Sequence, residues 1–244
     1  MVKVIAVTSG KGGAGKSTCS IGLAIALSKQ GKKVLLIDMD EGMRCLDMLL
    51  GVSENLLFDL SDALNGRDLS SCLLNIKKFP DISLLAAPAE KGLVDSNKFS
   101  EFLATLKDSD FDAVIADLPA GSDKTLYRAF PVHTEFICVC NANPVSVRDA
   151  AAIGRLLKEI DRDGRLIINK FEPYFIKNPV FKDIDGIIDQ SGLMLLGIVP
   201  YSDRLSLAFL NGKFAVKGKE AKAFTRIVKR IYDKAEPLPK LKKI

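Results

Sequence analysis

Residues 9–18 read SGKGGAGKST and combine glycines, lysines and hydroxyl side chains in one short run. Within it, residues 10–17 fit the pattern G-x-x-x-x-G-K-[ST]. Glycines let backbone N–H groups turn inward around an anion, and the positive end of a following helix adds to the attraction. Lys16 is expected to reach the β- and γ-phosphates of a nucleotide, and the Ser17 hydroxyl to ligate Mg²⁺. The residues of this loop predicted to contact nucleotide are Gly10, Lys11, Gly12, Gly13, Ala14, Gly15, Lys16, Ser17 and Thr18.

The loop carries a second lysine, Lys11, although a phosphate-binding loop needs only one. Lys11 stands at the start of the loop, where its side chain need not follow the backbone N–H groups toward the phosphates. A second cation there could instead reach a polyphosphate held by a neighbouring copy of the chain. The alternative is a solvated lysine at the edge of the loop.

Aspartates follow two other apolar runs that read as strands. Asp38 and Asp40 stand two apart in IDMDEG, so in extended chain their side chains face the same way. Asp117 ends the apolar run of FDAVIADLPAG, and the Gly121 N–H after it could meet a γ-phosphate. Hydrated Mg²⁺ takes few protein ligands, and Ser17, Asp38, Asp40 and Asp117 are the predicted set. Helix capping is the alternative role for the first two aspartates.

The elements that position these residues are predicted by short apolar runs, typical of strands, which alternate with helical patterns along the whole chain. The expected strands are 3–9, 33–39, 82–88, 112–118, 135–141, 165–171 and 195–200, and the clearest helices are 16–30, 96–108, 145–160 and 217–235. The strands are continuously hydrophobic, as expected for parallel strands covered on both faces. We therefore expect a three-layer α/β sandwich with a mostly parallel sheet, as a single domain over 1–236 and a short basic tail over 237–244. In such folds ligands bind at the carboxyl ends of the strands.

The segment KGGAGKST resembles the deviant Walker A motif, K-G-G-x-G-K-[ST], of the MinD and ParA family of ATPases. The resemblance implies ATP and Mg²⁺ as cofactors and an ATP-dependent, face-to-face homodimer. It also implies that Lys11 contacts nucleotide across the dimer interface, and that Lys11, Lys16 and Asp40 serve catalysis.

The following motifs resemble the MinD branch of that family. IDMDEGMRCLD is similar to its switch I pattern, which implies that Asp40 orients the attacking water and that Asp38 supports metal and loop; Cys45 replaces the usual asparagine. NPVSVRDAA and GIVPYSDRL match further segments, and INKF places Asn169 where the family reads the adenine edge. An amide can pair with adenine, although asparagine after a strand is also an ordinary turn residue. The resemblance implies a switch in bacterial division-site placement, slow without an activating partner, with activating and effector proteins as partners.

Two other functions are weighed beside this one. Some metal or iron–sulfur cluster carriers of the superfamily use paired cysteines, but Cys138 and Cys140 lie in an apolar strand, which favours a core position. His133, the only histidine, lacks the neighbours of a zinc or catalytic site. A ParA-like DNA-segregation ATPase is supported only by the basic C-terminal end.

Composition bears on location and partners. The chain has 244 residues and a net charge of +5, but residues 213–244 hold eleven Lys and Arg against three Asp and Glu. We expect no secretory leader and no membrane span, hence a cytoplasmic protein that could bind peripherally at the inner membrane face. The basic end indicates an anionic surface, membrane or, less favoured, DNA; the alternative is a solvated helix face with a disordered tail. The tail EPLPKLKKI predicts only weak membrane contact.

Overall fold

The computed structural model describes residues 2–121, 123–172, 174, 183–211, 214–232 and 236–237. In this part of the chain, eight strands form one sheet in the order β3-β4-β2-β5-β1-β6-β7-β8. Every neighbouring pair is parallel except β3 and β4, which pair antiparallel at one edge. The strands are β1 (Lys3–Thr8), β2 (Val34–Asp38), β3 (Leu74–Asn75), β4 (Ile82–Leu85), β5 (Ala113–Asp117), β6 (Glu135–Asn141), β7 (Gly164–Phe171) and β8 (Met194–Pro200).

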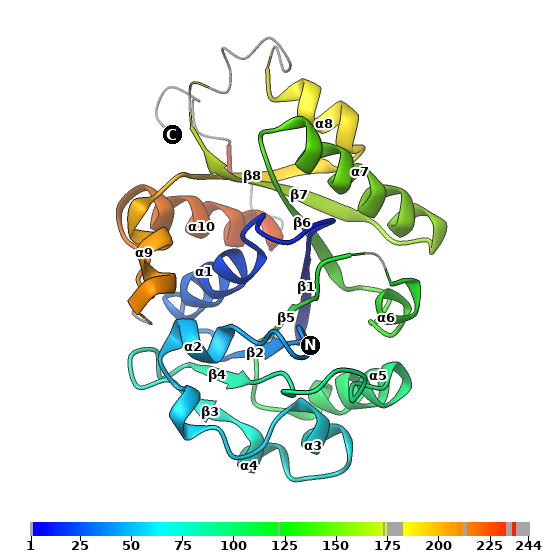
Figure 1. Cartoon of the computed structure of the whole chain (residues 1–244), viewed down its shortest axis with the longest axis vertical. Helices are drawn as coiled ribbons and strands as arrows, with labels where there is room; N and C mark the ends of the chain where they lie inside the picture. The colour runs from blue at the N-terminus through cyan, green and yellow to red at the C-terminus, as the bar shows by residue number, and fades with distance from the viewer. Residues whose placement is uncertain are drawn as a thin grey trace.

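Helices cover both faces of this sheet, with α1, α9 and α10 on one side and α5, α6 and α7 on the other (Figure 1). The α-helices are α1 (Lys16–Ser28), α2 (Leu46–Leu50), α3 (Leu60–Leu64), α4 (Leu69–Cys72), α5 (Ser96–Thr105), α6 (Lys124–Arg128), α7 (Pro144–Glu159), α8 (Asp185–Ser191), α9 (Asp203–Asn211) and α10 (Gly218–Ile231), with 3₁₀ turns at Ser53–Asn55 and Leu106–Asp108. The three-layer α/β sandwich with a mostly parallel sheet is confirmed.

The core is divided between the two faces of the sheet. In β1, Val4 and Ala6 belong to the cluster under α5, α6 and α7, whereas Ile5 and Val7 belong to the cluster under α1 and α10. Side chains on a strand alternate between faces, so a strand covered on both sides must be apolar at every position. This explains the continuous hydrophobic runs in the sequence.

All seven expected strands are present, and their ends agree within one residue except that β4 ends at Leu85, three residues before the expected end at 88. The long helices begin as expected, but α1 ends at Ser28 because the Gln30 N–H already bonds the Leu27 carbonyl in a tighter last turn. The single domain over 1–236 and the tail over 237–244 remain predictions, and residues 238–244 lie outside the described part of the chain. No helix in the described ranges is long and apolar enough to cross a membrane.

The carboxyl ends of the central strands meet at one edge of the sheet. Asp38, the last residue of β2, pairs in register with Asp117, the last residue of β5. β1 lies on the other side of β5, and the glycine-rich loop follows it. The topology therefore brings the predicted phosphate loop and both strand-end aspartates together.

Candidate active site

A cavity of about 540 Å³ opens at this edge of the sheet. Ligand pockets for molecules of nucleotide size fall in the same range. Its walls come from the glycine-rich loop, the segment after β2, the end of β7 and the segment from β8 into α9. The lining residues are Gly12, Gly13, Gly15, Lys16, Ser17, Thr18, Asp40, Met43, Cys45, Ala120, Asn169, Lys170, Pro200, Tyr201, Ser202, Leu205 and Ser206.

Two glycines of the loop are required by its geometry. Gly15 caps α1 with a φ of 96°, in the left-handed region that favours glycine, and a Cβ there would lie 2.1 Å from Asn169 Nδ2. Gly10 packs against α7, where a Cβ would lie 2.4 Å from the Asp149 carbonyl oxygen. The loop thus curls directly into the N-terminus of α1, whose backbone N–H groups face the cavity end of the helix.

Two residues at the end of β7 form hydrogen bonds to backbone carbonyls of the loop. The Asn169 amide donates to the Ala14 carbonyl at 2.9 Å, and Lys170 Nζ donates to the Gly13 carbonyl at 3.1 Å. Asn169 is buried and lines the cavity, as its predicted contact with adenine requires, but one of its N–H groups is already used by the loop. Lys170 was not singled out from the sequence, since nothing in its neighbourhood marks a lysine that bonds a loop carbonyl.

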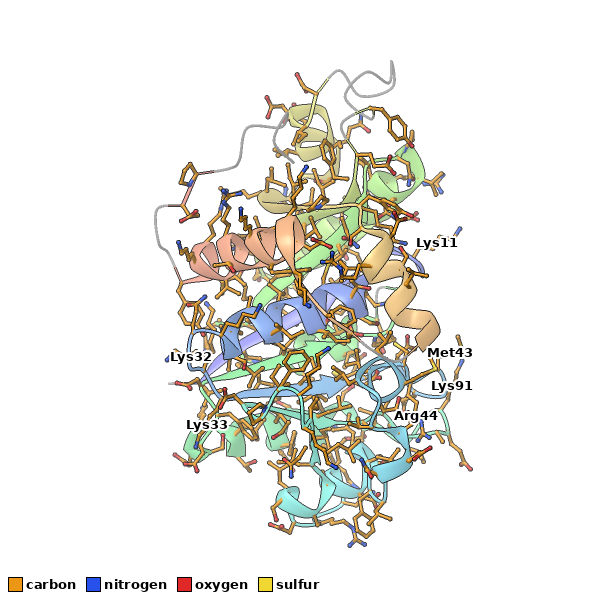
Figure 2. All side chains as sticks on the ribbon, turned by 90° about the vertical axis from the view of Figure 1, so that its left-hand side faces the viewer. Lys11, Lys32, Lys33, Met43, Arg44 and Lys91 are labelled. Atoms are coloured by element: carbon orange, nitrogen blue, oxygen red, sulfur yellow. The ribbon has the colours of Figure 1, made fainter. Side chains whose placement is uncertain are left out.

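The two lysines of the loop differ in position. Lys16 is only 8% exposed and lines the cavity. Lys11 is exposed, does not line that cavity, and instead borders a separate hollow with Asn143 and Asp149 at the start of α7. Figure 2 shows Lys11 projecting from the same edge of the molecule as Met43, away from Lys32 and Lys33. In a single chain, Lys11 therefore lies at the same edge as the cavity but outside the lining that includes Lys16.

The carboxylates of Asp38 and Asp117 lie buried behind the cavity. Asp38 accepts hydrogen bonds from the backbone N–H groups of Asp40, Cys45 and Leu46 at 3.0–3.1 Å, so it fixes the segment that follows β2. Burial raises its pKa, against the effect of those three bonds. Burial and then the neighbouring Asp38 carboxylate raise the pKa of Asp117 to about 7. Two carboxylates held close together in a dry site are poised to receive a cation.

The predicted magnesium ligand Ser17 lies beside Cys45. The Cys45 thiol donates to Ser17 Oγ at an S–O distance of 3.3 Å, while hydrogen bonds from Ser17 and Ser20 act against the rise in the pKa of Asp117. Burial raises the pKa of Cys45 to about 12, so the thiol is protonated at neutral pH. Cys45 thus makes a polar contact to the serine, at the position where the resembled pattern has asparagine.

Asp40 lines the cavity, whereas Gly121 does not. Asp40 is partly exposed and lines the cavity, where it could act on a water molecule next to a phosphate. Gly121 does not line it: its N–H donates to the Ser9 carbonyl at 3.1 Å. The predicted contact of that N–H with a γ-phosphate therefore needs the segment around Gly121 to move.

The structure brings most of the predicted residues to one cavity. Gly12, Gly13, Gly15, Lys16, Ser17, Thr18, Asp40 and Asn169 line it. The others lie beside or behind it, namely Gly10, Lys11, Ala14, Asp38, Asp117 and Gly121. The wall from Pro200 to Ser206 has no role predicted from the sequence, although it lies in the segment GIVPYSDRL that resembles the MinD branch. Apolar and hydroxyl residues of these common types form no motif from which a binding site could be predicted.

The residues set aside from the sequence are also placed. Cys138 and Cys140 lie in the middle of β6 with no exposed surface, and burial raises the pKa of both thiols. The expected core position is confirmed: both side chains belong to the buried cluster under α5, α6 and α7, so a metal between them would require that cluster to open. His133 is exposed in the turn before β6.

Replacement of Asp117 by asparagine is expected to stabilise the nucleotide-free protein at pH 8. Below the pKa of the unfolded chain, about 4, the carboxyl is neutral in both states and burial carries no charge penalty. Between about pH 4 and 7 the unfolded state ionises first, so wild-type stability falls as pH rises. We expect the gain of Asp117→Asn in the thermal unfolding temperature to grow over this window, by about 2–4 °C for each kcal/mol of stability gained.

The matched control is Asp112→Asn. A hydrogen bond from the Lys33 backbone N–H and another from Lys32 lower the pKa of Asp112, so its loss should destabilise the protein above pH 4. An Asp117→Asn protein whose relative stability does not change between pH 5 and 8 would contradict the buried, protonatable carboxyl.

The fold and the cavity define a P-loop nucleotide-binding protein. The glycine-rich loop leads into the N-terminus of α1, and the buried Lys16 lies beside it. A serine hydroxyl and carboxylates supply oxygen atoms, the ligands that Mg²⁺ prefers. The donor set therefore fits a magnesium–nucleotide complex, in which the metal would offset phosphate charge.

Comparison with known proteins agrees with this class. Residues 5–216 match the model of the CobQ/CobB/MinD/ParA nucleotide binding domain. The septum site-determining protein MinD of Helicobacter pylori is 34% identical over 95% of this chain and 91% of its own length. The chain belongs to this family, and within it to the MinD proteins.

Solved structures give the same result. The MinC:MinD cell division protein complex of Aquifex aeolicus contains a chain that matches with a TM-score of 0.86 and 30% identity, over 98% of this chain and 99% of that one. MinD from Pyrococcus horikoshii, complexed with Mg-ADP, matches with a TM-score of 0.81 and 26% identity, over 95% and 96% of the two chains. 

Proposed function

We propose that this protein is a MinD-like ATPase that acts as an ATP-dependent dimerisation switch in bacterial division-site placement. ATP and Mg²⁺ are its cofactors. The proposal is carried by the separation of the two loop lysines: Lys16 lines the nucleotide cavity, whereas Lys11 is exposed outside it. In a single chain Lys11 therefore makes no contact with its own nucleotide cavity. In a dimer of two chains placed face to face, each Lys11 would reach the phosphates held by the other copy and so complete its site.

The residues take the following roles in this proposal. Backbone N–H groups from Gly10 to Thr18 surround the phosphates, and Lys16 binds the β- and γ-phosphates. Ser17 ligates Mg²⁺, with Asp38 and Asp117 behind it. In addition, Asp40 orients the attacking water, Asn169 reads the adenine edge, and the Gly121 N–H turns to the γ-phosphate.

Hydrolysis is proposed to be slow in the isolated protein. Switch NTPases whose transition-state cation is supplied by another molecule turn over slowly alone. A cycle follows in which ATP assembles the dimer, the dimer binds effector proteins, and an activating protein triggers hydrolysis and release. The MinC:MinD complex of the Aquifex relative supports a MinC-type protein as one effector.

The oligomeric state tests this proposal directly. Static light scattering should give the mass of two chains with Mg·ATP and of one chain with Mg·ADP. A MinC homologue from the same genome should co-elute only with the ATP form. The protein concentration should reach 100-fold above a dimer dissociation constant of about 1 μM. A monomer with Mg·ATP as well as with Mg·ADP at that concentration would rule out the dimerisation switch.

Weak, salt-sensitive and ATP-dependent binding to anionic liposomes is expected through the tail over 237–244. Lys240, Lys242 and Lys243 could each add about 1 kcal/mol near an anionic leaflet. With only Leu238, Leu241 and Ile244 as apolar anchors in the sequence, one tail binds marginally, while two tails on a dimer act together through effective concentration. Co-sedimentation with ATP and with ADP measures this, and a peripheral location at the inner membrane face would follow.

Deletion of residues 237–244 is the matching control. Equal sedimentation of full-length and truncated protein, with ATP at low salt, would contradict the membrane role of the tail. Plasmid DNA in place of liposomes forms a separate arm of the experiment. Strong ATP-dependent retention on DNA alone would favour a ParA-like segregation function instead.

A further inference from the structure

Tyr127 joins the segment that follows β5 to the strand that leads into the glycine-rich loop. It lies in α6, a five-residue helix capped by the Asp123 carboxylate, which accepts from the Thr125 N–H. Its side chain is 1% exposed and stacks on Phe136 with ring centroids 5.5 Å apart. The ring is therefore fixed by packing, and the position of its hydroxyl is set by the core.

The hydroxyl of Tyr127 contacts two structurally different partners. It donates to the Gly121 carbonyl oxygen at 3.2 Å, and it hydrogen-bonds Thr8 Oγ1 at the end of β1. A phenol has a single proton, so the Thr8 hydroxyl donates to Tyr127 when Tyr127 donates to Gly121. Burial raises the pKa of the Tyr127 phenol well above its usual value, so the proton stays in place at neutral pH.

Gly121 is consequently held on both of its backbone groups. Its N–H donates to the Ser9 carbonyl at 3.1 Å, while its carbonyl accepts from Tyr127. Its φ of 119° lies in the region that favours glycine, and a Cβ there would meet no atom within 4 Å. Hence the conformation is maintained by the two hydrogen bonds rather than by side-chain packing around Gly121.

We propose that Tyr127 is a positioning residue that favours the arrangement of Gly121 seen here, with its N–H bonded to the Ser9 carbonyl, and so lowers the affinity of the site for ATP relative to ADP. This inference rests on the proposed ATPase function. To meet a γ-phosphate, the Gly121 N–H must leave Ser9. In the proposed movement the segment shifts as a unit, so the Gly121 carbonyl, in the next peptide plane, also leaves Tyr127, while the Tyr127–Thr8 bond can remain.

Tyr127→Phe tests the proposal, because it keeps the stacked ring and removes only the hydroxyl. Calorimetric titration in the presence of Mg²⁺ should show about a fivefold gain in affinity for the slowly hydrolysed analogue ATPγS, the effect of losing one hydrogen bond to a backbone carbonyl. Affinity for ADP should stay within twofold of wild type. Amide hydrogen exchange of Gly121 should also become faster in the nucleotide-free protein.

The control is Tyr232→Phe, which removes a buried hydroxyl that has no hydrogen-bond partner among the residues that the structure describes. It should leave the ratio of the two affinities and the exchange of Gly121 unchanged. If Tyr127→Phe folds poorly, Thr8→Val provides the second variant. Without the hydrogen bond donated by the Thr8 hydroxyl, the Tyr127 phenol is a weaker donor to Gly121, so the ratio should shift in the same direction by a smaller factor.

The outcomes separate this inference from the proposed function. An unchanged ratio of affinities in Tyr127→Phe, or weaker binding of ATPγS, would overturn the positioning role. A purely structural role would lower thermal stability and leave the ratio unaltered. Failure of the wild-type protein to bind either nucleotide would instead overturn the ATPase function itself.

Discussion

Lys16→Ala is expected to abolish nucleotide binding, with affinity for Mg·ATP falling at least about 100-fold. The Lys16 ammonium lines the cavity and is the group placed to bond two phosphates, and each charge-assisted hydrogen bond contributes about 1.5–3 kcal/mol. Isothermal titration measures the loss. Because the side chain serves ligand rather than core, thermal unfolding of the nucleotide-free variant should stay close to that of wild type.

Lys29→Ala is the matched control, since Lys29 is exposed at the other end of α1. It removes the same charge from the same helix without touching the cavity, and nucleotide affinity should be unchanged. ATP binding of wild-type strength in Lys16→Ala would mean that the cavity is not the nucleotide site.

Lys11→Ala should keep ATP binding but lose the ATP-dependent dimer, with steady-state hydrolysis reduced at least tenfold. Lys11 lies outside the lining of the cavity in its own chain, and in the proposed dimer its phosphate partner belongs to the other copy. A desolvated charge pair across an interface is expensive to break, because the remaining phosphate charge is left uncompensated. Light scattering and phosphate release measure the two losses separately.

Two further variants are compared with Lys11→Ala, one with a contrasting expected effect and one as a control. Asp40→Ala should bind ATP and accumulate as a dimer, since it removes the carboxylate that we propose orients the attacking water and leaves both lysines intact. Lys33→Ala removes a lysine from the opposite edge of the molecule (Figure 2) and should behave as wild type. A Lys11→Ala protein that dimerises and hydrolyses ATP normally would contradict a cross-subunit contact.

The parts of the fold that depend on periodic burial were predictable from the sequence. Seven strands have apolar runs because both faces of the sheet are covered, and α1, α5, α7 and α10 carry long amphipathic or buried patterns. β3 could not be found, since two residues give no period. The five-residue helices α2, α3 and α6 are also too short for a helical period to register, so only the fold around them reveals them.

The site was predictable where chemistry is encoded by local spacing. The loop around Lys16 and the strand-end aspartates follow such patterns, and the topology brings them together. The contacts that need tertiary structure were not accessible. Lys170 bonds the Gly13 carbonyl across 157 positions of sequence, and Tyr127 reaches Thr8 across 119. In each case an ordinary residue type acquires its role only from the packing of distant elements.

The bonds from Asn169 and Lys170 to the carbonyls of Ala14 and Gly13 have a kinetic consequence. They hold the glycine-rich loop in one arrangement before any ligand arrives, so the entropy of ordering this segment is lost during folding rather than during binding. Nucleotide capture then needs no slow rearrangement of the phosphate cradle, and its rate is governed by encounter. The slow steps of the proposed switching cycle belong instead to the segment around Gly121, whose N–H has to leave Ser9 before it can meet a γ-phosphate.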